Sequence, residues 1–211
     1  LTGVFIHTIG GALYAVATDS YRLAEKSLMK TSQDISLLVP ADAMQELLRI
    51  LPETIETVAV TADSQQVLFK AGDIELVTRL IDATYPDYKK LIPKTYTTTA
   101  TLPRDELVSI TKVSSLFARE SAGSVTLRVD EGEGRVSITS MASQLGENSS
   151  KASAKVEGEG EVTLNSRYLL DALNAIGTKE VTIGFNGKLE PFVITSKESQ
   201  GQTYLVMPLK S

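Results

Sequence analysis

Few side chains in this sequence could carry out covalent or metal chemistry. It has no cysteine, which excludes disulfides, thiolate zinc sites and cysteine nucleophiles, and its one histidine is His7. Imidazole is the usual general base and the commonest metal ligand, so a hydrolytic triad or a histidine-rich metal site would have to be built around that residue. A histidine on an N-terminal strand is more often a surface residue than a base. We therefore predict no catalytic residue, no metal and no cofactor.

An enzyme that uses carboxylates alone is one alternative, with Asp19 acting together with Asp82 or Asp87. The sequence argues against it only by absence. Gly132 and Gly134 lie in a hairpin turn that lacks the lysine and the helix start of a phosphate-binding loop, and no residues have metal-ligand spacing. A non-enzymatic protein is the better prediction.

The composition is that of a globular protein. The 211 residues are 42% hydrophobic and 22% charged, and their number allows one large domain or two small ones. No apolar run approaches the ~18 to 20 residues of a membrane span and no leader opens the chain, so we expect a soluble, cytoplasmic protein with no membrane partner. The net charge is −5 and neither half is basic, so any role on DNA would rest on locally placed charge or on topology.

Three segments repeat one pattern of a short apolar strand, a helix opener, an amphipathic helix and further strands. The helix openers Pro40, Pro103 and Asn165 lie 63 and then 62 residues apart, which indicates an internal duplication. Residues 1–28 fit the same pattern as a repeat unit without its first strand and helix. Since the chain also begins at Leu1 without a methionine, we expect it to be a fragment of a longer protein.

The expected elements follow from apolar spacing and turn residues. The inward-facing helix residues are predicted to be Met44, Leu47, Leu48 and Leu51, then Leu107, Ile110 and Leu116, then Leu169, Leu170, Leu173 and Ile176, with Gly177 ending the third helix. Strands are expected at 4–6, 12–18, 21–28, 35–39, 58–61, 66–70, 75–81, 99–102, 125–129, 135–139, 151–157, 161–164, 181–185, 192–195 and 203–207. The polar, serine-rich stretch 141–154 is expected to be a loop that connects strands.

This pattern resembles the bacterial DNA polymerase III beta subunit family, the sliding clamps of the replisome. The resemblance spans essentially the whole chain, and four motifs carry it in order: Ala17-Thr-Asp-Ser-Tyr-Arg-Leu-Ala24, Pro86-Asp-Tyr88 after Leu80-Ile-Asp82, Asn165-Ser-Arg-Tyr-Leu-Leu-Asp-Ala-Leu173, and Tyr204-Leu-Val-Met-Pro-Leu209. It implies an α+β DNA clamp fold of repeated strand-helix-strand-strand-strand units, two units per domain, with helices on one face and antiparallel sheets outside. Residues 1–97 would be a middle domain that lacks its first strand and helix, and residues 98–211 a complete C-terminal domain.

The function that the resemblance implies is that of a non-catalytic processivity factor in a DNA-directed DNA polymerase complex. The full-length protein would be a homodimeric ring that encircles duplex DNA without reading its sequence, with the helices lining the hole. This chain, without the first domain that joins the third across the ring interface, is expected to be a monomer or to make only a non-physiological contact. The expected DNA-facing residues are Arg49, Arg104, Lys112, Arg119, Arg167 and Lys179. Asp42 and Glu46 accompany Arg49, so the first helix is less basic than is usual in the family.

The resemblance also implies a groove that binds short linear motifs of the replicative polymerase subunit, the clamp loader and repair polymerases. Its residues would be Leu1, Thr18, Ser20, Tyr21, Arg22, Leu23, Pro86, Lys90, Leu91, Asn165, Tyr168, Pro191, Leu205, Val206, Met207, Pro208 and Leu209. Two departures matter: Ser20-Tyr21 replaces a common Gly-His, so that Tyr21 would narrow the groove, and Lys210-Ser211 replaces a basic-apolar ending.

Simpler interpretations remain for several of these residues. Leu23, Leu205 and Val206 alternate within strands and fit an ordinary core, and Pro86 and Pro208 fit turns or strand edges. Exposed lysines and arginines on helices are mostly solvated charge. The alternative function is a repeat-built protein-interaction scaffold without a DNA role.

Overall fold

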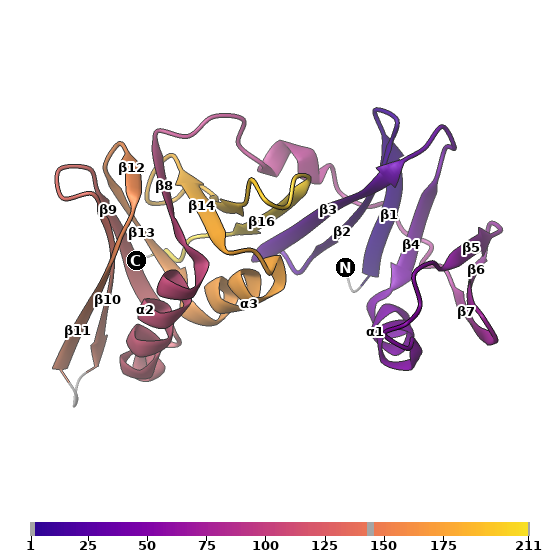
Figure 1. The fold of residues 1–211 in the computed structure, drawn as a ribbon, viewed down its shortest axis with the longest axis horizontal. Helices are drawn as coiled ribbons and strands as arrows, with labels where there is room; N and C mark the ends of the chain where they lie inside the picture. Colours follow the sequence, from indigo (N-terminus) through magenta and orange to yellow (C-terminus); the bar gives the residue numbers. More distant parts are fainter. Residues whose placement is uncertain (1–2, 143–145, 211) are drawn as a thin grey trace. The chain divides into compact units, whose positions relative to one another are not determined.

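A computed structural model describes residues 3–142 and 146–210. Leu1, which was expected in the groove, lies outside the described residues. The chain forms two compact lobes (Figure 1): the first comprises Leu1–Ser20 and Glu25–Pro86, and the second comprises Tyr21–Ala24 and Asp87–Ser211.

The first lobe contains two antiparallel sheets and one α-helix. One sheet has the order β3-β2-β1-β4, and in it the central strand β1 pairs Phe5 with Val16 of β2 and with Leu38 of β4. The other sheet has the order β5-β6-β7. The elements are β1 (Gly3–Ile9), β2 (Ala12–Thr18), β3 (Arg22–Lys30), β4 (Ser36–Pro40), α1 (Ala41–Ile50), β5 (Ala59–Ala62), β6 (Gln66–Ala71) and β7 (Ile74–Arg79). A small core joins α1 to both sheets: Ile6, Val39, Leu47, Val67 and Phe69.

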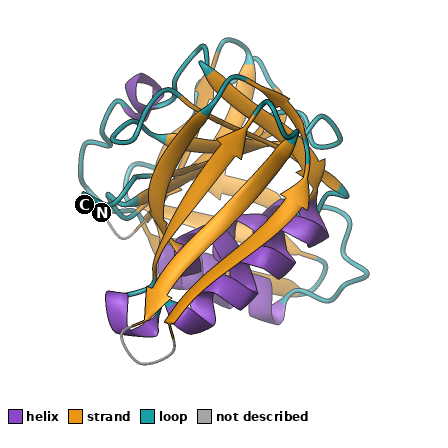
Figure 2. Cartoon of the chain, turned by 90° about the vertical axis from the view of Figure 1, so that its left-hand side faces the viewer, coloured by secondary structure: helices purple, strands orange, loops and turns teal. Residues whose placement is uncertain are grey.

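The second lobe has two larger sheets and two α-helices that lie side by side on one side of the strands (Figure 2). Its sheets have the orders β12-β8-β14-β15-β16 and β11-β10-β9-β13, and the first residues of β3 belong to this lobe as well. The elements are η1 (Tyr88–Leu91), β8 (Thr98–Pro103), α2 (Arg104–Phe117), η2 (Arg119–Ser121), β9 (Ser124–Asp130), β10 (Arg135–Ala142), β11 (Gly146–Ser153), β12 (Lys155–Glu157), β13 (Gly160–Asn165), α3 (Ser166–Ile176), β14 (Glu180–Phe185), β15 (Phe192–Thr195) and β16 (Gln202–Val206).

The three predicted helix starts are confirmed, because α1, α2 and α3 begin directly after Pro40, Pro103 and Asn165. Asn165 is a true N-cap: its side-chain oxygen accepts hydrogen bonds from the backbone amides of Arg167 at 2.9 Å and Tyr168 at 3.3 Å. Gly177, at φ 64°, ends α3 in the left-handed conformation that glycine adopts without strain. Each of the three α-helices thus directly follows a strand and is followed by further strands, as the sequence repeat predicted.

Two leucines predicted to face inward are exposed. Leu116 is 53% exposed, because at 100° per residue it lies half a turn away from the buried Leu107. Leu48 is 79% exposed, although Leu173, at the corresponding position of α3, is fully buried. The difference lies in the neighbours, since α3 packs beside α2 whereas α1 has no second α-helix beside it among the described residues of its lobe.

Residues 141–154 were wrongly expected to be a loop. Among the described residues of this range, Met141 and Ala142 end β10 and Gly146–Ser153 form β11, which pairs antiparallel with β10, Met141 opposite Glu147 and Arg135 opposite Ser153. β11 is an edge strand with alternating exposure, and its polar composition suits a strand that faces solvent. The strand expected at 151–157 is in fact split at Ala154 between β11 and β12, which belong to different sheets.

His7 is also not the surface residue that its strand position suggested. It is 9% exposed, and its ring stacks on Phe5 at 4.5 Å and on Tyr14 at 6.0 Å between ring centroids. Tyr85 stacks on the same Phe5 at 4.7 Å. Burial raises the pKa of Tyr85 to about 12. These rings cover the face of β1 and β2 opposite to the α1 core.

Candidate functional site

Three of the predicted groove residues that the structure describes, Thr18, Ser20 and Pro86, belong to the first lobe. Thr18 ends β2, and its hydroxyl accepts a hydrogen bond from the backbone amide of Ser20 at 3.3 Å. Ser20 has a φ of 75°, a left-handed conformation that is unfavourable for a residue with a Cβ. Pro86 is exposed. The turn at Ser20 therefore stores backbone strain directly before Tyr21.

The second lobe brings four side chains together around the ring of Tyr168, here called the Tyr168 cluster: Tyr21, Arg22, Tyr168 and Asp171. The guanidinium carbon of Arg22 lies 4.5 Å from the centre of the Tyr168 ring, and its Nη1 donates to Asp171 Oδ2 at 2.5 Å. The Tyr21 ring stacks on Tyr168 with centroids 6.4 Å apart and planes inclined by 29°. Tyr21 is 62% exposed, so the cluster presents an aromatic surface to solvent.

The backbone holds the C-terminal residues beside this cluster. After β16 the amide of Met207 donates to the carbonyl of Tyr21 at 2.8 Å, and the amide of Leu209 donates to the carbonyl of Thr163 in β13 at 2.8 Å. Met207, Pro208 and Leu209 are each half-buried. The structure thus places Tyr21, Arg22, Tyr168 and Met207, all predicted groove residues, in one connected surface.

Leu23, Leu205 and Val206, also predicted groove residues, are buried. Their exposed fractions are 3%, 1% and 1%. Val206 belongs to the main hydrophobic core of the lobe, with Tyr168 packed against the same core. Burial of this kind is what the core interpretation of these three residues predicts, and Val206 belongs to the close-packed core that supports Tyr168.

The remaining groove residues have separate roles in the structure. Asn165 caps α3 and also donates from its side-chain nitrogen to the carbonyl of Ala122 at 3.3 Å. Lys90 is exposed and pairs with Asp87 at 3.0 Å, and Leu91 beside it is 45% exposed. Pro191 is half-buried.

Sequence reasoning missed Asp171 as a member of this surface. It lies three residues after Tyr168 on α3, and side chains at that spacing share a helix face. Its position inside the motif that runs from Asn165 to Leu173 was the available signal, but its partner Arg22 is 149 residues away in the sequence.

Two of the six predicted DNA-facing cations are held in ion pairs. Arg49 makes hydrogen bonds with Glu46 at 2.9 and 2.5 Å, which hold the pKa of the Glu46 carboxyl below its usual range. Arg104 pairs with Asp105 at 2.5 Å and donates to the carbonyl of Leu173 at 3.4 Å. The other four cations, Lys112, Arg119, Arg167 and Lys179, are exposed. Acidic and basic side chains are equal in number on α2 and on α3, so neither helix is basic as a whole.

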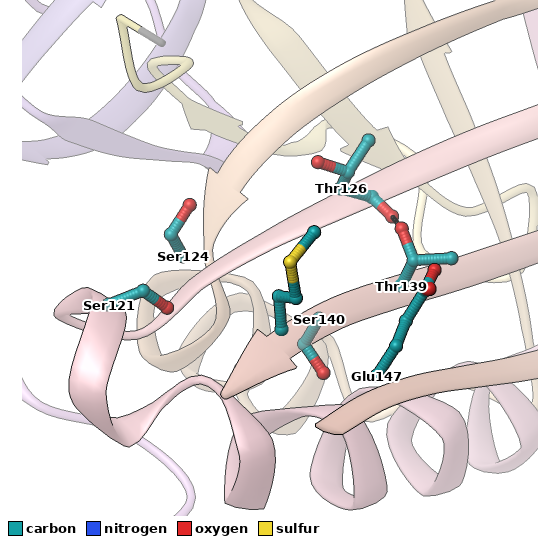
Figure 3. Close-up of a pocket in the computed structure, with 7 residues that line it drawn as sticks. Ser121, Ser124, Thr126, Thr139, Ser140 and Glu147 are labelled. Carbon is teal, nitrogen blue, oxygen red and sulfur yellow. Dashed lines mark hydrogen bonds between the residues drawn. The ribbon is translucent and has the colours of Figure 1, made fainter. Parts of the chain in front are cut away.

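A shallow polar pocket of about 180 Å³ lies on the β9–β10–β11 sheet (Figure 3). Its lining residues are Ser121, Ser124, Thr126, Thr139, Ser140, Met141 and Glu147. The hydroxyl of Thr139 donates to the carbonyl of Thr126 at 3.4 Å. The lining combines hydroxyl groups with one carboxylate, that of Glu147, and one thioether, that of Met141.

The carboxylates of the alternative enzyme are exposed, and Asp87 is already paired with Lys90. Within residues 3–142 and 146–210, no three side chains of the metal-binding types are grouped closely enough to hold an ion. No helix in the same ranges is both long and apolar enough to cross a membrane.

The chain matches two family models in succession. Residues 1–87 match the model described as DNA polymerase III beta subunit, central domain, and residues 89–210 match the one described as DNA polymerase III beta subunit, C-terminal domain. A beta sliding clamp from Staphylococcus aureus is 32% identical over 215 residues, and one from Staphylococcus epidermidis is 31% identical. Both alignments cover the whole chain and 57% of the relative, so the chain spans little more than half the length of these relatives.

Solved structures agree with the sequence matches. The crystal structure of the DNA polymerase sliding clamp from Bacillus subtilis superimposes with a TM-score of 0.93 at 29% identity, covering the whole chain and 57% of that protein. The DNA polymerase III beta subunit from Thermotoga maritima gives a TM-score of 0.91 at 29% identity, with 58% of that protein covered.

Proposed function

Because the chain belongs to the DNA polymerase III beta subunit family, we propose that it is part of a DNA sliding clamp, a non-catalytic processivity factor of the bacterial replicative polymerase. The observation that carries this proposal is the order of the two family matches, central domain and then C-terminal domain, over nearly the whole chain. A closed ring stays on duplex DNA by topology and needs no tight contact with any base or phosphate.

We place the two clamp domains at residues 1–97 and 98–211. The boundary follows the repeat, since β8, the first strand of the second domain, begins at Thr98. The second lobe also takes in η1 and the loop that follows it.

We propose that the DNA-facing charge comes chiefly from the four exposed cations Lys112, Arg119, Arg167 and Lys179. Arg49 and Arg104 contribute less, because a cation already paired with a carboxylate must give up that partner to bind phosphate. Each phosphate contact adds about one unit to the slope of log affinity against log salt, so few contacts leave a weak, mobile attachment. When the free energy of binding changes little from one position on the DNA to the next, the protein can slide along the duplex.

Partner proteins would dock on the connected surface of Tyr21, Arg22, Tyr168 and Met207. A short extended peptide would insert Leu or Phe side chains there, each contributing about 1.5–3 kcal/mol on burial. The flexible thioether of Met207 can repack around different anchors. The remaining predicted groove residues complete this proposal, and the expected partners are the polymerase subunit, the clamp loader and repair polymerases.

Ring closure would use the free edge of the second lobe. β11 is an edge strand in the sheet order β11-β10-β9-β13, and α2, which packs against β11, exposes Val113 and Leu116 by 41% and 53%. A strand with one unpaired edge, beside exposed apolar side chains, is suited to pairing with another chain. The full-length protein would then be a homodimer in the cytoplasm, where bacterial DNA is replicated.

The test is retention on DNA. The full-length protein, loaded by a clamp loader on nicked circular duplex and then passed through a gel-filtration column, should remain with the circle and be lost when the circle is cut to a linear form. A protein-interaction scaffold would behave alike on both forms. Equal recovery on circular and linear DNA would therefore contradict the clamp proposal.

A further inference from the structure

One member of the Tyr168 cluster, the carboxylate of Asp171, is not among the proposed groove residues. Tyr168 and Asp171 project from the same face of α3, Arg22 is the first residue of β3, and Tyr21 directly precedes that strand. The chain of contacts runs from Asp171 Oδ2 to Arg22 Nη1 at 2.5 Å, from the Arg22 guanidinium to the Tyr168 ring at 4.5 Å, and from that ring to Tyr21 at 6.4 Å. Arg22 and Tyr168 thus link Asp171 to Tyr21 by successive contacts.

The ion pair contributes little to the stability of the fold. The side chains of Arg22 and Asp171 are 37% and 48% exposed, and pairs so open to solvent are screened. The same ion pair can nevertheless fix the orientation of the Arg22 guanidinium. A guanidinium is a flat group that stacks on an aromatic face, and a carboxylate at its edge fixes the orientation of that plane. The pair is therefore better suited to orienting Tyr168 than to stabilising the lobe.

We propose that Asp171 is a positioning residue of the partner-peptide surface, which orients Arg22 over Tyr168 and thereby fixes the exposed ring of Tyr21. This inference rests on the proposed peptide-binding function of the same surface. Tyr21 is also tied to the groove by its backbone, because its carbonyl accepts the Met207 amide at 2.8 Å. A ring held in place before binding loses less conformational entropy when a peptide packs against it.

The first measurement is fluorescence anisotropy of a labelled Gln-Leu-x-Leu-Phe peptide titrated with this chain and its variants. Asp171→Asn keeps the shape of the side chain and removes its charge, and we expect roughly fivefold weaker binding because one side chain is no longer pre-ordered. Asp171→Glu restores the carboxylate and should bind more tightly than Asp171→Asn. The matched control is Glu75→Gln, which breaks the similarly exposed Lys70–Glu75 pair of the β6–β7 hairpin and should leave binding unchanged.

Binding by Asp171→Asn equal to that of the unsubstituted chain would overturn the inference. A loss of binding accompanied by a fall in the thermal unfolding midpoint, absent in the control, would also overturn it, since that result indicates a purely structural role.

A second readout needs no peptide. Stacking on Tyr168 should shift the ring protons of Tyr21 upfield in the NMR spectrum, and Asp171→Asn should move them towards their values in an unstructured peptide. An unchanged Tyr21 spectrum would refute the positioning role. If the unsubstituted chain binds no peptide, the docking proposal fails, and this spectrum still decides whether Asp171 positions the ring.

Discussion

The internal repeat provides a matched pair of leucines whose truncation should have very different effects. Leu48 in α1 and Leu173 in α3 occupy the same position after their helix starts at Pro40 and Asn165, but Leu48 is 79% exposed and Leu173 is 0% exposed. Leu173 packs in the core of the second lobe. Truncating a fully buried leucine to alanine lowers the free energy of unfolding by about 2–5 kcal/mol, which includes the cavity left behind.

The same change at Leu48 should matter little. Only about a fifth of that side chain is covered, and surface substitutions usually stay within about 0.5 kcal/mol. We therefore expect Leu173→Ala to be less stable than Leu48→Ala by about 2–4 kcal/mol. Urea unfolding followed by circular dichroism measures both values. Hydrogen exchange then reports whether protection is lost in the second lobe for Leu173→Ala, because two lobes need not unfold as one.

Equal destabilisation by the two variants would refute this reasoning. It would mean that the outer face of α1 is covered in solution by something that the described residues do not include. A Leu173→Ala variant with nearly unchanged stability would equally contradict the burial on which the estimate depends.

Three further changes have defined outcomes. Asn165→Ala removes the N-cap of α3 and should lower the free energy of unfolding by about 1 kcal/mol in urea titrations, whereas Asn165→Asp, which can still accept from the two amides, should retain most of it. Gly184→Ala places a Cβ 2.7 Å from the ring of Tyr96 and should cost about 1–3 kcal/mol, measured as a lower thermal midpoint; an unchanged midpoint would show that the ring moves aside easily. Burial raises the pKa of Tyr85 to about 12, whereas the pKa of tyrosine in the unfolded chain is near 10. The free energy of unfolding should therefore keep its full Tyr85 contribution below about pH 10 and lose it as the pH rises towards 12, because the unfolded chain gives up the phenol proton first. Because Tyr85 is only partly buried, the loss should be about 1 kcal/mol, and urea titrations across this range should show a smaller fall for Tyr85→Phe.

The local features of the fold could be predicted because they depend on nearby residues. Pro40, Pro103 and Asn165 mark helix starts, since a fixed φ or a side-chain acceptor acts on the first turn alone. Gly177 ends α3 for an equally local reason. Residues 141–154 could not be recognised in the same way, because β11 is a polar edge strand whose pairing with β10 is not encoded in apolar alternation.

The candidate site was predicted in part. The motifs pointed to Tyr21, Arg22, Tyr168 and Met207, and these residues meet in the second lobe. The participation of Asp171 could not be read from the sequence, because helical spacing places it beside Tyr168 but says nothing of Arg22. The burial of His7 was missed for the same reason, since its covering ring Phe5 is near in sequence but Tyr14 reaches it only by cross-strand pairing.

By itself, the sequence determined the repeat, the helix starts and the family, because these depend on local chemistry and on the order of residues along the chain. Tertiary structure decided which of two equivalent leucines is buried, which cations are already paired, and which carboxylate orients the exposed aromatic ring. Burial and ion pairing depend on what a second element places opposite each side chain, and residues separated by more than a hundred positions can supply that neighbour.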